Sequence, residues 1–150
     1  MCGIAGSLSH HASDSIDALT DALRHRGPDD RQQWRGSGIA LGVQRLAIVD
    51  RLRGRQPFQT EGVVMVCNGE IYNHETLRAQ LEEKGHQFQT QCDVEVILHG
   101  YREWGSGFVR RLQGQFAFAI WDNRKQRLML ARDRYGIVPL AYTRMGGGFT

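Results

Sequence analysis

A cysteine stands at the second position of the chain, in the opening run Met1-Cys2-Gly3-Ile4-Ala5-Gly6. If Met1 is removed after synthesis, Cys2 carries a thiol and a free α-amine on one residue. A terminal amine, with an ordinary pKa of roughly 7.7–8.0, is suited to accept a thiol proton near neutrality. The opening residues therefore predict a nucleophile that brings its own base. An ordinary start followed by a core strand with a buried cysteine explains them equally well.

Three further positions carry side chains that suit chemistry on a small polar substrate. Arg45 stands between two short apolar runs; it is either a surface residue or a guanidinium that grips a carboxylate at two points. Asn68-Gly69 follows an apolar run and is typical of a hairpin turn, but a strand end there would also present oxyanion donors. Asp93 precedes a helical pattern, where an N-cap is the alternative to a binding role.

The elements that must position these residues follow from periodicity. The β-branched run 63–67 predicts a buried strand, and the opening residues predict another. Helices are expected over 15–24, around Leu77 and Leu81 with Asn73 as cap, and over 94–101. Further expected elements are a turn at 24–30, extended segments at 38–43 and 46–49, a hairpin of 115–122 with 127–133, and a last strand near 137–140. The simplest architecture for these elements places the helices on the outside of packed sheets.

Composition narrows the function classes. The chain has 150 residues, of which 41% are hydrophobic and 23% charged, as in one soluble globular domain. Three cysteines without zinc-type spacing predict neither a disulfide framework nor a metal site, and they favour a reducing cytoplasm. No apolar run approaches the ~18 residues of a membrane helix. The net charge of +3 invites a nucleic-acid partner, but the basic clusters lack interleaved aromatic residues, so none is expected.

Five motifs occur in order along nearly the whole chain. They are Met1-Cys2-Gly3-Ile4; Arg24-His25-Arg26-Gly27-Pro28-Asp29; Arg45-Leu46-Ala47-Ile48-Val49-Asp50; Asn68-Gly69-Glu70-Ile71-Tyr72-Asn73-His74; and Arg132-Asp133 with Gly136 and Pro139-Leu140. Together they resemble the glutaminase domain of glutamine-hydrolysing asparagine synthetases. These are class II glutamine amidotransferases of the N-terminal nucleophile hydrolase group.

The resemblance implies an α+β fold, a four-layer αββα sandwich of mainly antiparallel sheets. It also implies a role for each matching position. Cys2 would attack the glutamine side-chain amide, with Asn68 and the Gly69 N–H as the oxyanion hole. Arg45 would hold the substrate α-carboxylate and Asp93 its α-ammonium. Three further residues, Ile48, Val49 and Glu70, would line the pocket.

The resemblance further implies that residues 1–150 are a glutaminase unit cut before a C-terminal synthetase domain. That domain, in cis or in trans, would receive the ammonia and would alone need ATP and Mg²⁺. No cofactor is expected in the chain itself. A homodimer is left open, as is the identity of the ammonia acceptor. The alternative from another class is a catalytically silent module that scaffolds or regulates a synthetase partner.

Overall fold

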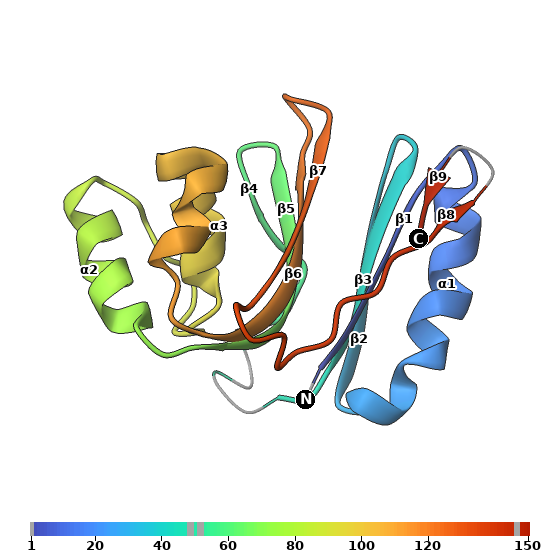
Figure 1. The fold of residues 1–150 in the computed structure, drawn as a ribbon, viewed down its shortest axis with the longest axis horizontal. Coiled ribbons are helices and arrows are strands. Elements are labelled where there is room, and N and C mark those ends of the chain that lie inside the picture. Colours follow the sequence, from blue (N-terminus) through green and yellow to red (C-terminus); the bar gives the residue numbers. More distant parts are fainter. Residues whose placement is uncertain (1, 48–49, 51–52, 146–147) are drawn as a thin grey trace.

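The chain folds into four layers, helix–sheet–sheet–helix, seen edge-on in Figure 1. The computed structural model describes residues 2–47, 50, 53–145 and 148–150. The first sheet has the order β2-β3-β1-β9-β8 and the second the order β4-β5-β6-β7. Every strand pairing within the described residues is antiparallel. The α+β sandwich expected from the resemblance is confirmed.

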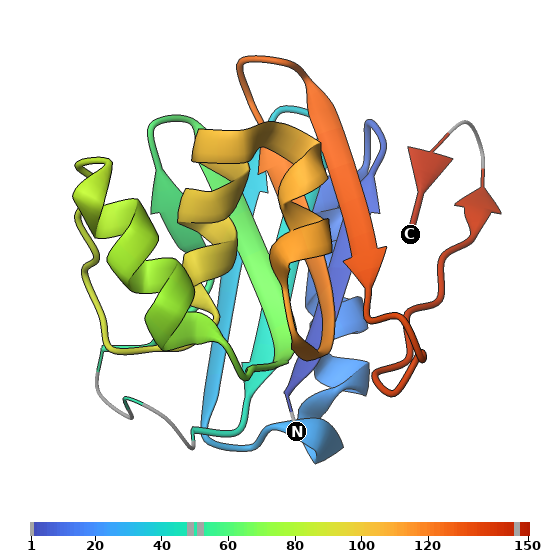
Figure 2. The ribbon, with the colours of Figure 1, turned by 60° about the vertical axis from the view of Figure 1, so that its left-hand side comes forward.

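The first sheet is built from β1 (Gly3–Leu8), β2 (Asp30–Gly36), β3 (Ile39–Arg45), β8 (Arg144–Met145) and β9 (Gly148–Phe149). Helix α1 (Ala12–Ala22) covers its outer face and leads into a 3₁₀ turn, Arg24–Arg26. The second sheet is built from β4 (Phe58–Thr60), β5 (Val63–Ile71), β6 (Gly114–Asp122) and β7 (Arg127–Arg132). Helices α2 (His74–Glu83) and α3 (Glu95–Trp104) cover it, as Figure 2 shows, and a 3₁₀ segment, Gly105–Arg111, follows α3.

Three apolar clusters hold the layers together. The largest lies between the second sheet and helices α2 and α3, and includes Met65 and Phe118. A second cluster fills the space between the two sheets, with Leu41 from β3 facing Val66 from β5. The third lies under α1, where Ile16 meets Ala40. Burial of these apolar side chains is the main force that docks the four layers.

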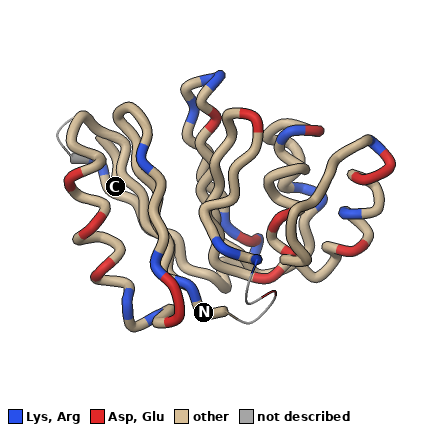
Figure 3. The backbone as a smooth tube through the Cα atoms, turned by 180° about the vertical axis from the view of Figure 1, so that it is seen from behind, with Lys and Arg blue, Asp and Glu red and all other residues tan. Residues whose placement is uncertain are grey.

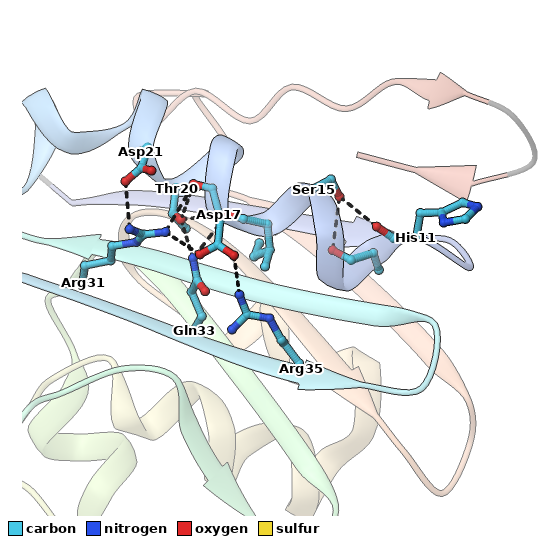
Figure 4. A network of polar contacts seen from close by, with 10 residues as sticks. His11, Ser15, Asp17, Thr20, Asp21, Arg31, Gln33 and Arg35 are labelled. Carbon is cyan, nitrogen blue, oxygen red and sulfur yellow. Dashed lines mark hydrogen bonds and ion pairs between the residues drawn. The ribbon is translucent and has the colours of Figure 1, made fainter.

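Polar contacts fix α1 against β2 along the outer edge of the first sheet (Figure 4). Asp17 accepts hydrogen bonds from Arg31 and Arg35, both at 2.7 Å, and Asp21 pairs with Arg31 at 2.9 Å. Deeper in, Gln33 donates to the Thr20 hydroxyl at 2.6 Å. These contacts set the rotation of the helix on the sheet, while its buried face supplies most of the stability.

Several expected elements need correction. The structure carries β5 through Asn68-Gly69 to Ile71, so the turn expected at these two residues is wrong. Pairing of Gly69 with Phe116 of β6 keeps this segment extended. Strand β2 was not expected, and no strand forms at 137–140. Residues 46 and 47 are not in a strand, and the remainder of the expected segment 46–49 lies outside the described residues.

Neither of the two residues considered as helix caps, Asn73 and Asp93, caps its helix through its side chain. The side chain of Asn73 does not cap α2; it accepts from Gln113 N–H and donates to the Arg111 carbonyl. The residue before α3 is Val94 rather than Asp93, whose carboxylate bonds elsewhere. Each polar side chain thus serves a contact between elements instead of its own helix.

Charge is distributed without a single dominant patch. In Figure 3 the charged positions along α1 are all acidic, while Lys, Arg, Asp and Glu positions are scattered over the other elements. Among the described residues, no helix is both long enough and apolar enough to span a membrane.

Candidate active site

Cys2 lies where β1 begins, between the two sheets. The antiparallel pairing of Gly3 with Gln44 brings Cys2 level with Arg45 at the end of β3. Its Sγ lies 3.4 Å from the Leu46 N–H and 3.7 Å from the Leu46 carbonyl oxygen. Its own carbonyl accepts a hydrogen bond from Arg26 Nε at 3.3 Å. The thiol is therefore held by backbone contacts at a fixed place on the end of the first sheet.

The turn after α1 shapes this end of the sheet. A Cβ on Gly27 would lie 2.4 Å from the Gln44 carbonyl oxygen, so only glycine allows the turn to approach β3 so closely. Asp29 accepts a hydrogen bond from Ala47 N–H at 2.8 Å, and its own N–H donates to the Arg45 carbonyl at 3.1 Å. Asp29 thus fixes the backbone on both sides of Leu46.

Arg45 is buried rather than on the surface, with 5% of its area exposed. Its Nη2 donates to the Asp50 carbonyl at 2.8 Å. The Asp50 carboxylate in turn accepts from the N–H groups of Gln91 and Arg53. These two backbone hydrogen bonds, the Gln91 one foremost, lower the pKa of Asp50. The guanidinium is therefore held on a scaffold that joins β3 to the segment before α3.

Strand β5 presents two different faces to its surroundings. Successive side chains of a strand point to opposite faces. Cys67 belongs to the cluster under the helices, and Val66 belongs to the cluster between the sheets, which also contains Cys2. Asn68 and Glu70 follow Val66 in the same alternation. Their side chains therefore lie on the face of β5 that is turned toward Cys2.

The edge of β5 supplies backbone donors next to Asn68. Gln56 extends the pairing beyond β4: its side chain accepts from Cys67 N–H at 2.6 Å and donates to the Cys67 carbonyl at 2.9 Å. Two residues beyond Gly69 on the same edge, Ile71 N–H donates to Asp93. Because N–H groups alternate between the two edges of a strand, the Gly69 N–H points to this edge, between Gln56 and Asp93.

Asp93 lies just before α3 and bonds to β5. Its Oδ2 accepts the Ile71 N–H at 2.7 Å, and its Oδ1 lies 3.8 Å from the Cys92 Sγ. The side chain is buried, with 6% exposure for the residue. A buried carboxylate facing a cavity is suited to bind a cationic group of a ligand.

These residues surround one cavity of about 220 Å³. Six of the eight predicted site residues line it: Cys2, Arg45, Asn68, Gly69, Glu70 and Asp93. The other two, Ile48 and Val49, lie outside the described residues. Among these six residues are a thiol, an amide, a guanidinium and two carboxylates, drawn from both sheets and from the segment before α3.

Sequence reasoning missed several residues of this site. Leu46 contacts the thiol, Arg26 holds the Cys2 carbonyl and Gln56 clamps Cys67, and none was assigned a role. The only signal for Arg26 was its place in a dense polar turn beside a Gly-Pro pair. Gln56 gave no signal, since its contact spans 11 positions of the chain.

The two other thiols at the cavity differ from Cys2 in their surroundings. Burial, and next the Asp93 charge, raise the pKa of Cys92 to about 12. Burial, again followed by Asp93, raises the pKa of Cys67 well above its usual range. Both therefore stay protonated at neutral pH and act as packing groups, as expected for Cys92. Within the described residues, no group of three or more ligating side chains forms a metal site.

Comparison with known proteins shows which family the chain belongs to. Residues 1–150 match the family model described as a glutamine amidotransferase domain. Asparagine synthetase [glutamine-hydrolyzing] 3 of Bacillus subtilis is 42% identical over 99% of this chain and 26% of its own length. Asparagine synthetase [glutamine-hydrolyzing] 2 of Oryza sativa is 47% identical over 93% of this chain and 24% of its own length. The chain thus spans about a quarter of these curated relatives.

A solved structure supports the fold independently. The glutamine phosphoribosylpyrophosphate amidotransferase of B. subtilis superposes with a TM-score of 0.82 at 22% sequence identity. The match covers 99% of this chain and 41% of the other. This likeness concerns the fold, while the family model and the relatives above identify the chain as a member of the glutamine amidotransferase domain family, in the branch found in glutamine-hydrolysing asparagine synthetases.

Proposed function

We propose that this domain hydrolyses the side-chain amide of glutamine, with Cys2 as the nucleophile once Met1 has been removed. The observation that carries the proposal is the shared cavity, where Cys2 from one sheet meets Asn68 and Gly69 from the other. A thiol, a set of oxyanion donors and two opposite charges are the parts that this reaction needs.

In the proposed first step, the α-amine of Cys2 takes the thiol proton while sulfur bonds to the amide carbon. The carbonyl oxygen becomes an oxyanion, which accepts hydrogen bonds from the Asn68 side chain and the Gly69 N–H. Each donor of this kind contributes roughly 2.7–4 kcal/mol in enzymes where one has been removed. The intermediate collapses when the ammonium group returns a proton to the leaving nitrogen, which departs as ammonia.

Water completes the reaction. It attacks the γ-glutamyl thioester, the α-amine accepts a proton from it, and the same oxyanion donors are used again. Glutamate leaves and the Cys2 thiol is restored. The proposed reaction therefore involves no oxidation or reduction and needs no cofactor. General base catalysis by a group near neutrality contributes typically about 10²–10⁴-fold.

We assign recognition of the substrate backbone to two of the three charged residues that line the cavity, Arg45 and Asp93. Arg45 would bind the α-carboxylate of glutamine and Asp93 its α-ammonium, so that a plain amide would bind weakly. Glu70 would line the pocket, as would Ile48 and Val49 outside the described residues. Two opposite charges that bind the neighbouring α-carboxylate and α-ammonium orient that end of the ligand, and ligands that carry only one of these groups bind more weakly.

We further propose that the ammonia passes to a synthetase domain, in cis or in trans. The lengths of the relatives support an arrangement in cis, because this chain matches only 26% of the B. subtilis synthetase. ATP and Mg²⁺ would act in that second domain. Whether the acceptor is aspartate or another carboxylate is left open.

The test is mass spectrometry of the intact chain after incubation with the diazo-ketone analogue of glutamine, diazo-oxo-norleucine. The proposal expects a mass without Met1, plus one adduct that maps to Cys2 and is absent from a Cys2→Ala variant. Adducts on Cys67 or Cys92 would contradict the assignment of the nucleophile. A free Cys2 that stays unlabelled would favour the silent-module alternative.

A further inference from the structure

Two buried histidines face each other beside the segment that leads to Asp93. His99 lies on α3 and is 3% exposed, and His86 follows α2 with 9% of its side chain exposed. Their Nδ1 atoms are 3.3 Å apart, and their rings meet edge to face. Neither residue touches the cavity of the proposed reaction, so their contact needs its own explanation.

Each ring also meets a carboxylate through its outer nitrogen. His86 Nε2 lies 3.0 Å from Glu103 Oε2, and His99 Nε2 lies 3.5 Å from Glu95 Oε1. Carboxylate oxygens only accept, so His86 Nε2 donates to Glu103, and a proton on His99 Nε2 would point at the nearby Glu95 carboxylate. The contact between the two Nδ1 atoms then needs a third proton. Two neutral imidazoles carry only two protons, so a pair that donates to both carboxylates and also bonds through its Nδ1 atoms holds one extra proton and one positive charge.

The surroundings suit one positive charge on the pair. Lys84 Nζ pairs with Glu103 Oε1 at 3.0 Å. With one positive charge on the histidine pair, the two carboxylates Glu95 and Glu103 are balanced by two cations. Hydrogen bonds from His86, then Lys84, lower the pKa of Glu103. Burial alone would raise the pKa of Glu95, but hydrogen bonds from His99, Gln89 and Thr90 leave it lowered. Both acids are therefore anions at neutral pH.

Glu95 connects the histidines to the substrate site. Its Oε1 accepts from Gln89 N–H at 2.8 Å, and its Oε2 accepts from the N–H and the hydroxyl of Thr90 at 2.9 and 2.6 Å. The Thr90 hydroxyl oxygen accepts from Cys92 N–H at 3.0 Å. Asp93 is the next residue. The position of Glu95 thus sets the course of the backbone into Asp93.

We propose that His86 and His99 share one proton and act as positioning residues, which hold Glu95 and, through the segment 89–92, place Asp93 against the α-ammonium of glutamine. This inference rests on the function proposed above. Loss of the shared charge leaves the buried Glu95 carboxylate with weaker partners, and the segment that it holds then shifts. The amide end of the substrate, at Cys2, is not affected.

The proton count can be read from the parent chain by nuclear magnetic resonance of ¹⁵N-labelled histidine rings. His86→Gln and His99→Gln variants assign the signals. The proposal expects three protonated nitrogens among the four of this pair. Two or four protonated nitrogens would overturn it. This readout does not depend on glutamine hydrolysis, so it stands or falls apart from the proposed function.

The positioning role can be read from kinetics with two substrates, glutamine and glutaramate, which lacks the α-amino group. His99→Gln should raise the KM for glutamine by on the order of tenfold at nearly unchanged kcat. The KM for glutaramate should not change, because that substrate makes no use of Asp93. The exposed His10→Gln is the matched control, expected to behave as the parent.

Equal losses with both substrates, or a fall in kcat alone, would overturn the positioning role. If His99→Gln fails to fold, Glu103→Gln serves in its place, because Glu103 is less buried and contacts only the outer end of the pair. A parent that hydrolyses neither substrate would count against the proposed function instead, and the nitrogen spectrum would still decide the shared proton.

Discussion

The N–H of Ile71 donates a 2.7 Å hydrogen bond to Oδ2 of Asp93. This contact ties the end of β5 to the start of α3. Asn68 and Gly69 lie just before Ile71 on the same strand, so the proposed oxyanion donors and the proposed ammonium ligand are joined by this hydrogen bond. Asp93 therefore has two separable duties, a structural one toward the backbone and a proposed one toward the substrate.

A pair of variants separates these duties. Asp93→Asn keeps an oxygen that can accept the Ile71 N–H but loses the charge, so the KM for glutamine should rise at least tenfold with little change in stability. Asp93→Ala loses both and should also cost about 1–3 kcal/mol of unfolding free energy. Steady-state kinetics and urea unfolding check this. An Asn variant with unchanged KM would remove Asp93 from substrate binding.

Gly69 is a position where a single methyl group should damage both the fold and the proposed reaction. Its Cβ would lie 2.2 Å from the Gln115 carbonyl oxygen and 2.6 Å from the Phe116 Cα, so β5 and β6 would have to separate. We expect Gly69→Ala to lose about 1–3 kcal/mol of stability and nearly all hydrolysis. Thermal unfolding and an ammonia-release assay measure the two effects.

Gly107→Ala is the matched control for this experiment. A Cβ at Gly107 meets no atom within 4 Å, and no positive φ is recorded there. The control should keep the parent's melting temperature and turnover. If Gly69→Ala kept the melting temperature and turnover of the Gly107→Ala control, the close approach of β6 to Gly69 would not explain why glycine stands there.

Arg45→Lys tests the proposed carboxylate grip while keeping the charge. A lysine cannot present two parallel N–H donors, so glutamine should bind about tenfold more weakly. The rate of Cys2 labelling by a small neutral alkylating reagent should stay close to the parent's, since that reagent has no carboxylate. If both labelling and KM were unchanged, Arg45 would have no part in binding.

Asp133 supplies a prediction about pH. Burial by itself would raise the pKa of this carboxyl, but N–H donors of Val138, Ile137, Phe116 and Tyr135 hold the pKa below its ordinary value. The donor distances run from 2.9 to 3.3 Å. Asp133→Asn should therefore cost about 2 kcal/mol at neutral pH.

The sign of the pH effect follows from linkage. The folded pKa lies below the unfolded value of about 3.9, so the stabilisation is complete above that pH. This stabilisation is lost as the pH falls through the lowered pKa that Asp133 has in the folded protein. The difference in unfolding free energy between parent and Asp133→Asn should thus narrow below about pH 4. Asp14→Asn, whose side chain is 80% exposed in the parent, should show a much smaller difference. A constant difference down to acid pH would contradict the argument.

Periodicity predicted the elements that bury one clear face. Helices α2 and α3 follow the spacing of their buried leucines and valines, and β6 with β7 follows the alternating hairpin pattern. Strand β2 was not predicted because its sequence is polar. It lies at the edge of the sheet, where pairing with β3 rather than burial keeps it extended.

The misread residues of the site share one physical reason. Asn68-Gly69 is a turn by local preference, but nine register pairs between β5 and β6 override that preference. Asn73 and Asp93 have the chemistry of caps, yet each bonds a backbone group far away in the sequence. Local propensity cannot weigh contacts between distant segments. The family resemblance, which compares whole motifs, predicted a shared pocket for Asn68, Gly69 and Asp93, and the structure places these three residues around one cavity.

The division of the cavity between the sheets has a consequence for how the protein can be studied. Cys2 belongs to the first sheet and Asn68 to the second, so the cavity exists only while the two sheets are docked. A loosened state that retained both sheets would keep its circular dichroism signal but lose selective reaction of Cys2 with the glutamine analogue. If Cys2 reacts as proposed, labelling of the thiol reports whether the two sheets are docked, which circular dichroism of the backbone does not detect.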